Sequence, residues 1–144
     1  MVPYRGDAPL ITALIAGEVE LAVIPVPTAL SHIQSGALRA LGLTRATRTS
    51  ALPEVPTIAE QGFPGFDTAS WHGFFVAAKT PQDVVLRIYQ ETKKALEASD
   101  VRDRLLSLGA EPVATSPEEF SILYKADIEK FKQVVRDAGI SPLD

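Results

Sequence analysis

The residue types that could do catalytic chemistry lie together in one short stretch, DTASWHGFF at residues 67–75. Asp67, Ser70 and His72 are the residue types of a hydrolase triad, in which a histidine takes the proton of a serine nucleophile. Ser70 and His72 are two residues apart on a predicted strand, so they cannot form the nucleophile–base hydrogen bond, and no Gly-x-Ser-x-Gly elbow surrounds the serine. We therefore predict no catalytic residues, and we interpret these side chains as polar residues beside a cleft or hinge.

Metal and cofactor sites lack their usual sequence signals. The chain has no cysteine, and His32 and His72 are its only histidines. Neither histidine has a second ligand four residues away, as a site on one helix face would require. Gly6 stands alone before a predicted helix, so the sequence contains no glycine-rich phosphate loop. We predict no metal and no cofactor, and a binding role rather than an enzymatic one.

Charge and hydropathy exclude two further classes. The 14 basic and 18 acidic residues give a formal net charge of -4, and the basic residues are spread along the chain. Nucleic-acid binding requires clustered Lys and Arg, so we predict no nucleic-acid partner. No apolar run approaches the roughly 20 residues that span a bilayer. The first residues also lack the basic-then-apolar pattern of a secretory signal, and we expect no signal peptide in this chain.

The most suggestive binding feature is a six-residue turn at the start of the sequence. It consists of Tyr4, Arg5, Gly6, Asp7, Ala8 and Pro9. The extended run 2–5 leads through a glycine into a helix predicted over residues 7–16, which Asp7 is expected to cap. In open parallel sheets, ligands bind where strands end and helix N-termini present unpaired N–H groups. A plain strand–helix connection would give the same pattern, so both interpretations stay open at this point.

The elements that would position this turn are marked by glycines and helix caps. Five glycines follow apolar-periodic runs and indicate helix ends: Gly17, Gly36, Gly62, Gly109 and Gly139. Two strong amphipathic helices are predicted after Thr80 and Ser116. Each has a hydroxyl cap, a proline at the first helical position and an acidic residue that can close a capping box. A shorter helix is expected near residues 101–108, and the proline-rich stretch after Thr44 is expected to hold at most one short helix, around residues 57–61.

Strand-like runs alternate with the first helices. We predict strands at residues 20–26, 38–44 and 67–78, and a possible strand at 111–114. Helix followed by buried strand, twice over, is typical of a parallel sheet built by crossover connections, and so of an α/β fold. We expect residues 1–68 to be the remainder of one α/β lobe, which includes the ligand turn. Residues 69–77 would form a return crossover or hinge, and residues 78–144 the mainly helical C-terminal part of the other lobe.

Several segments resemble a known family. VPYRGDAPLITALIAGEVELAV, ALSHIQSGALRALGLT, RTSALPEVPTIAEQGFPGF, SWHGFFVAAKTP and LGAEPVATSPEEF are similar, in this order, to the second half of the Bug-type extracytoplasmic solute-binding receptors of tripartite tricarboxylate transporters. The resemblance covers essentially all 144 residues. It implies a periplasmic-binding-protein-like (Venus flytrap) fold with doubly wound lobes, here incomplete. It also implies a periplasmic location for the complete protein, and membrane subunits of the transporter as partners.

The resemblance assigns the ligand-binding role to specific residues. The family's Tyr-Lys/Arg-Gly-Gly-x-Pro turn matches the turn at residues 4–9, which would hold a small carboxylate through backbone amides and bridging waters. That ligand would be a dicarboxylate, a tricarboxylate, an amino acid or an aromatic acid. The second cleft element matches residues 24–28, which places Pro25 and Val26 at the ligand. Trp71 lies near the crossover and could wall the cleft, although core packing is the favoured role for it.

Two residues depart from the family pattern. Asp7 stands where the family often has glycine, and its charge would repel a carboxylate unless it turns inward to cap its helix or faces a cationic part of the ligand. Val26 lies where many members have a polar residue, which implies a more apolar pocket wall.

Two functional hypotheses follow from the sequence. In the first, the chain is a fragment of a carboxylate receptor and binds weakly on its own, because the opposing wall of the cleft belongs to the other half of the family's chain. In the second, it is a self-assembling or regulatory protein, in which two chains complete each other's sheets by strand exchange and form a homodimer.

Overall fold

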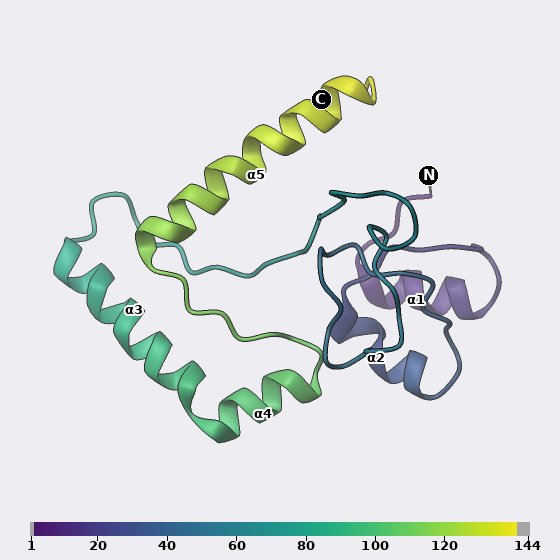
Figure 1. The fold of residues 1–144 in the computed structure, drawn as a ribbon, viewed down its shortest axis with the longest axis horizontal. Helices are drawn as coiled ribbons and strands as arrows, with labels where there is room; N and C mark the ends of the chain where they lie inside the picture. Colours follow the sequence, from purple (N-terminus) through teal and green to yellow (C-terminus); the bar gives the residue numbers. More distant parts are fainter. Residues whose placement is uncertain (1, 141–144) are drawn as a thin grey trace. The chain divides into compact units, whose positions relative to one another are not determined.

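The computed structural model describes residues 2–140, which form two compact units (Figure 1). The first unit contains the residues up to Phe74 together with Ser99–Pro112. The second contains Phe75–Ala98 and the residues from Val113 onward. The chain therefore passes from one unit to the other after residues 74, 98 and 112. The lobe boundaries predicted at residues 68 and 77 concern the complete two-lobed fold and stay a prediction.

The first unit contains three short helices, α1 (Asp7–Ile15), α2 (Val26–Gln34) and α4 (Ser99–Ser107) (Figure 1). The prediction that Asp7 caps α1 is wrong, because the helix begins at Asp7 itself and Gly6 occupies the cap position. Gly6 has a φ of 103°, which a glycine adopts without a steric penalty, so the chain enters the helix one residue earlier than expected.

The core of the first unit forms around one face of α2. Leu30 packs with Leu43, Leu52 and Val55, and all four side chains are at most 7% exposed. Burial of a leucine of this kind contributes about 1.5–3 kcal/mol relative to leaving it in water. The apolar positions of a nine-residue helix are therefore enough to fix α2 against the loop that carries Leu52 and Val55.

The runs predicted as strands form no hydrogen-bonded ladder within residues 2–140, and the run predicted at 20–26 ends in α2, which begins at Val26. One parallel bridge is present, in which Leu43 donates to the carbonyl of Pro56 and accepts from the amide of Ile58, both at 2.9 Å. A strand requires a neighbour that pairs with its backbone and a layer that covers its side chains. Leu21 and Val23 are 70% and 79% exposed, so the run 20–26 has no covering layer here.

The proline-rich loop after Leu43 contains no helix at residues 57–61 and is held there by a hydrogen-bonded turn. The backbone N–H of Thr57 donates to Glu60 Oε2 at 2.7 Å, and the N–H of Glu60 donates to Thr57 Oγ1 at 3.1 Å. These are the reciprocal bonds of a capping box. Arg48 Nε then donates to both oxygens of Glu60, at 3.1 and 3.0 Å, and its Nη1 donates to the carbonyl of Pro53. Arg48 therefore links two later parts of the same loop, at Pro53 and at Glu60.

The second unit contains the two long helices, α3 (Gln82–Glu97) and α5 (Pro117–Asp137), which contact each other. The capping box predicted for α5 is confirmed, with Ser116 as the cap and Glu119 as its partner. The hydroxyl cap predicted for α3 is wrong. Pro81 takes the cap position with an extended ψ of 143°, which leaves Thr80 one residue too far from the helix.

An aromatic cluster joins α5 to the segment before α3. Phe75 packs edge-on against Phe120 and Tyr124, with both pairs of ring centroids 5.6 Å apart. Such edge-to-face pairs contribute about 0.5–1.5 kcal/mol beyond the area that they bury. The helix predicted near residues 101–108 is confirmed as α4, and all five predicted helix-ending glycines have positive φ.

Replacing Leu52 with alanine should destabilise the first unit by about 2–4 kcal/mol, because the substitution leaves a cavity in the core. Leu52 is 3% exposed, whereas Leu21 is 70% exposed and serves as the matched control. Urea unfolding followed by fluorescence measures both variants. Equal losses of stability in Leu52→Ala and Leu21→Ala would show that this core does not hold the unit together.

Candidate functional site

The two segments identified as ligand elements meet at the N-termini of α1 and α2. Thr28 donates its hydroxyl to Asp7 Oδ2 at 3.3 Å, across 21 residues of sequence. Asp7 is the first residue of α1, and Thr28 lies in the first turn of α2. The structure therefore brings residues 4–9 and residues 25–28 to one place, as a shared site would require.

Backbone donors are available at this place. Neither α1 nor α2 has a side-chain cap on its N-terminus. The first amides of a helix have no intrahelical acceptor, and the helix dipole adds a partial positive charge there. In α2, the amides of Thr28 and Ala29 both donate to the carbonyl of Pro25, at 3.0 and 3.2 Å. These two amides are already paired and Pro27 has no N–H, so the amide of Val26 is the backbone donor that α2 offers at this point. An anionic oxygen is the chemical group that such a pair of helix ends attracts.

Asp7 opposes that attraction. A carboxylate in the first turn of a helix is favoured by the helix dipole, and Asp7 is half-buried beside Thr28. Its negative charge also lies where a ligand anion would approach the amides of α1. Since Asp7 does not cap its helix, its charge stays available to discriminate between ligands.

The other predicted site residues lie around this point or elsewhere in the first unit. Tyr4 and Val26 are half-buried, whereas Arg5, Pro9 and Pro25 are exposed. Gly6 and Ala8 are exposed as well. Trp71 is half-buried and lies outside any helix, three residues before the end of the first unit. Its role as a wall of the cleft stays a prediction.

One of the residues considered for catalysis, Asp67, has a structural partner. Asp67 accepts a hydrogen bond from the backbone N–H of Ala46 at 3.2 Å, which ties the aromatic run to the loop that follows Leu43. In the part of the chain that the structure describes, no three His, Cys, Asp or Glu side chains are grouped as metal ligands.

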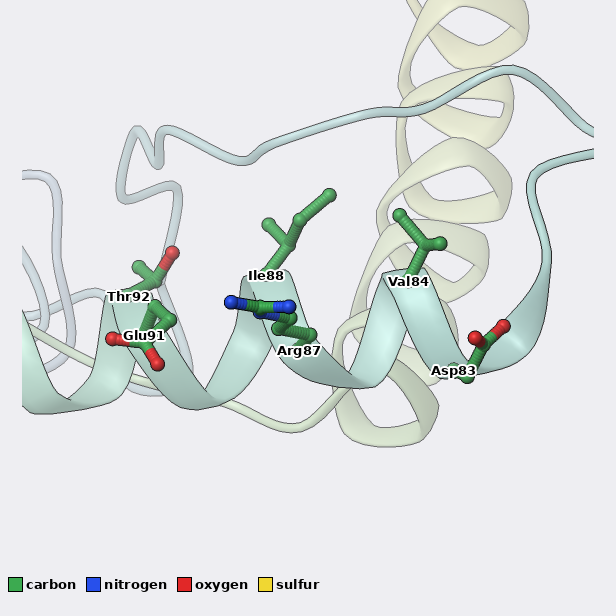
Figure 2. A pocket seen from close by; sticks show the side chains of 6 residues that line it. All are labelled: Asp83, Val84, Arg87, Ile88, Glu91 and Thr92. Atoms are coloured by element: carbon green, nitrogen blue, oxygen red, sulfur yellow. The ribbon is translucent and has the colours of Figure 1, made fainter.

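A separate hollow lies along α3 in the second unit. It has a volume of about 520 Å³ and is lined by Asp83, Val84, Arg87, Ile88, Glu91 and Thr92. Figure 2 shows these six side chains along one helix. Because no second element contributes a wall, the hollow could not enclose a ligand, and the helix ends of α1 and α2 are the better candidate.

The sequence interpretation missed the ion pairs that brace the first unit. Arg45 Nη2 lies 2.6 Å from Glu111 Oε2, and Arg48 pairs with Glu60. The hydrogen bond from Arg48 lowers the pKa of Glu60 below its usual 4.5, and the bond from the Thr57 amide lowers it further. Arg45 lowers the pKa of Glu111 in the same way, against the opposing effect of burial. The Thr-x-x-Glu spacing at 57–60 was the signal that could have indicated the second of these networks.

Comparison with known proteins identifies the class of protein. Residues 1–140 match the model of the tripartite tricarboxylate transporter family receptor. A curated relative, the UPF0065 protein in the tcbD-tcbE intergenic region of Pseudomonas sp. (strain P51), is 39% identical over 135 residues, which are 93% of this chain and 40% of the relative.

Solved structures of periplasmic binding proteins share the fold. R. palustris Rpa4515 with adipate is 34% identical with a TM-score of 0.89, and the match covers 99% of this chain and 48% of that one. The periplasmic binding protein BugD is 27% identical with a TM-score of 0.80, over 97% and 48% of the two chains. The chain therefore has the fold of about half of a periplasmic binding protein.

The chain belongs to the tripartite tricarboxylate transporter receptor family, and the resemblance stated from the sequence is confirmed. Its α/β, periplasmic-binding-protein-like fold class is confirmed as well. The chain spans about two fifths of the length of the curated relative and about half of the solved structures that it matches. Among residues 2–140, no helix is long and apolar enough to cross a bilayer.

The lowered pKa of Glu60 predicts a loss of stability in acid. A carboxylate whose pKa is depressed on folding stabilises the fold above its unfolded pKa, and this contribution is lost as the pH falls through the folded pKa. We therefore expect the urea midpoint to fall as the pH decreases below the usual value of 4.5. In Glu60→Gln this fall should be smaller, because one proton fewer is taken up on unfolding.

The control is Glu54→Gln, which removes an exposed carboxylate from the same loop. It should keep the pH dependence of the original chain. If Glu60→Gln and Glu54→Gln have identical urea midpoints from pH 7 to pH 3, the Arg48–Glu60 pair does not contribute to the stability of the loop.

Proposed function

We propose that this chain forms one wall of the ligand cleft of an extracytoplasmic solute receptor and that the ligand is a small carboxylate. The observation that carries the proposal is the contact between Asp7 and Thr28, which brings the N-termini of α1 and α2 together. The family of the chain and the adipate complex of Rpa4515 support the class of ligand.

The proposed site consists of the residues identified from the sequence. They are Tyr4, Arg5, Gly6, Asp7, Ala8, Pro9, Pro25, Val26 and Trp71. Backbone amides of the two helix ends would donate to the ligand carboxylate, and the helix dipoles would add to the attraction. Gly6 has no side chain and no atom within 4 Å of the position where a Cβ would stand, so a ligand can approach the backbone closely. No proton transfer or bond cleavage is part of this role.

The complete receptor would act in the periplasm, and it would deliver its ligand to the membrane subunits of the transporter by closing its two lobes. These roles extend the proposal from the chain to the whole protein. The chain contributes one wall of the cleft, so its own affinity for a carboxylate should be weak.

Nuclear magnetic resonance titration with adipate tests the proposal, because chemical shifts detect weak binding and also locate it. We expect weak binding, with the largest shifts at the amides of Gly6, Asp7, Ala8 and Val26. Adipamide, which lacks the charges, is the matched ligand control and should cause no such shifts. The proposal is wrong if adipate moves none of these amides, or if adipamide moves them equally.

Asp7 should set the preference between ligands. Replacing it with asparagine removes a like charge near the ligand anion. This change should tighten the binding of glutarate roughly tenfold, or about 1.4 kcal/mol. The binding of glutamate, whose ammonium group can face Asp7, should weaken instead. Titrations of both ligands into Asp7→Asn and into the original chain measure the effect, and parallel changes for the two ligands would contradict it.

A specific observation also favours self-assembly as a second function. Leu21 and Val23 are 70% and 79% exposed on a segment that pairs with no neighbouring strand within residues 2–140. Two chains could pair these edges and bury the apolar side chains between them. Light scattering at micromolar concentration decides the question: a dimer supports strand exchange, and a monomer excludes it.

A further inference from the structure

Gly109 lies against the second element of the candidate site. It follows α4 with a φ of +76°. A Cβ at this position would stand 2.8 Å from Val26 Cγ1, 3.5 Å from Leu30 Cδ2 and 3.6 Å from the Cβ of Ala51. Real Cβ atoms essentially never approach another heavy atom to less than 3.0 Å. Glycine is therefore required here for two separate reasons, its conformation and the closeness of α2.

The segment around Gly109 is fixed on both sides. On the side of α4, the amide of Gly109 donates to the carbonyl of Leu106 at 2.9 Å, and the amide of Ala110 donates to the carbonyl of Leu105 at 3.0 Å. After it, Glu111 pairs with Arg45 at 2.6 Å. The segment is thus held in place, so an atom added at Gly109 has to be accommodated on the side of Val26 and the start of α2.

Val26 is the side chain that such an atom would displace first. It is the first residue of α2 and one of the proposed ligand residues. The rest of α2 is held by Leu30, which is 5% exposed in the core of the first unit. The displacement would therefore fall on the exposed end of the helix, where the amides proposed to bind the ligand lie.

We propose that Gly109 is a positioning residue for the ligand site: by having no side chain, it lets the first turn of α2 lie where Thr28 contacts Asp7 at the N-terminus of α1. The consequence for ligand affinity rests on the proposed function, whereas the placement of α2 does not.

The test is a comparison of two glycine-to-alanine variants of this chain. Gly109→Ala adds the atom that would meet Val26. Gly36→Ala is the matched control, because Gly36 also has a φ of +76° and follows the other end of α2, but has no atom within 4 Å of its Cβ position. Both variants carry the same backbone strain, and they differ in the contact.

Amide hydrogen exchange at Thr28 and Ala29 is the first measurement. Overpacking against a fixed helix should speed exchange there about fivefold or more in Gly109→Ala relative to Gly36→Ala. In the Val26→Ala background, which lacks Cγ1, adding Gly109→Ala should cause no more acceleration than adding Gly36→Ala. Equal exchange in the two single variants overturns the inference. So does an acceleration by Gly109→Ala that is undiminished in the Val26→Ala background.

Adipate titration of the same variants is the second measurement. Gly109→Ala should weaken binding about fivefold relative to Gly36→Ala, if the amides of α2 hold the ligand. Should the original chain fail to bind adipate while the exchange result is as expected, the proposed function is wrong and the positioning role of Gly109 stands. The two failures are thus distinguishable.

Discussion

The first unit depends on the burial of Thr57, which is 1% exposed. Its hydroxyl and its backbone N–H both bond to Glu60, so no polar atom is left without a partner at this buried point. The residues on either side pair with Leu43, which lies in the same core as Leu30 of α2. A turn of four residues therefore fixes a long loop, and through the core it also fixes the helix that carries half of the candidate site.

Local signals in the sequence predicted the helices well, because each helix end has its own chemistry. Ser116 with Glu119 determined the start of α5, and glycines such as Gly109 marked helix ends. The two cap predictions that are wrong concern polar residues that stand next to a glycine or a proline. Gly6 and Pro81 take the cap positions of α1 and α3, where Asp7 and Thr80 were predicted. The strand predictions failed for a different reason. A strand forms only where a second segment pairs with its backbone, and the alternation of apolar and polar residues in one segment does not show whether such a partner is present.

The candidate site was only partly predictable for the same reason. The turn at residues 4–9 could be found by its pattern, but the contact from Asp7 to Thr28 joins residues far apart in the sequence. The sequence also gave no indication that Gly109 lies against Val26, because its helix-ending role already accounted for a glycine there. Asp7 combines two opposing effects: its charge suits the helix end on which it lies, and it disfavours the anion that the same helix end attracts.

Trp71, the single tryptophan of the chain, lies in the first unit. The second unit contains α3 and α5, which are 16 and 21 residues long, and the first unit contains three helices of nine residues each. Tryptophan emission therefore reports on the first unit alone, whereas the second unit contributes more than the first to the helical far-ultraviolet circular dichroism signal. Melting curves recorded by these two optical methods on a single sample would reveal directly whether the two halves of this chain unfold as one cooperative body or as two.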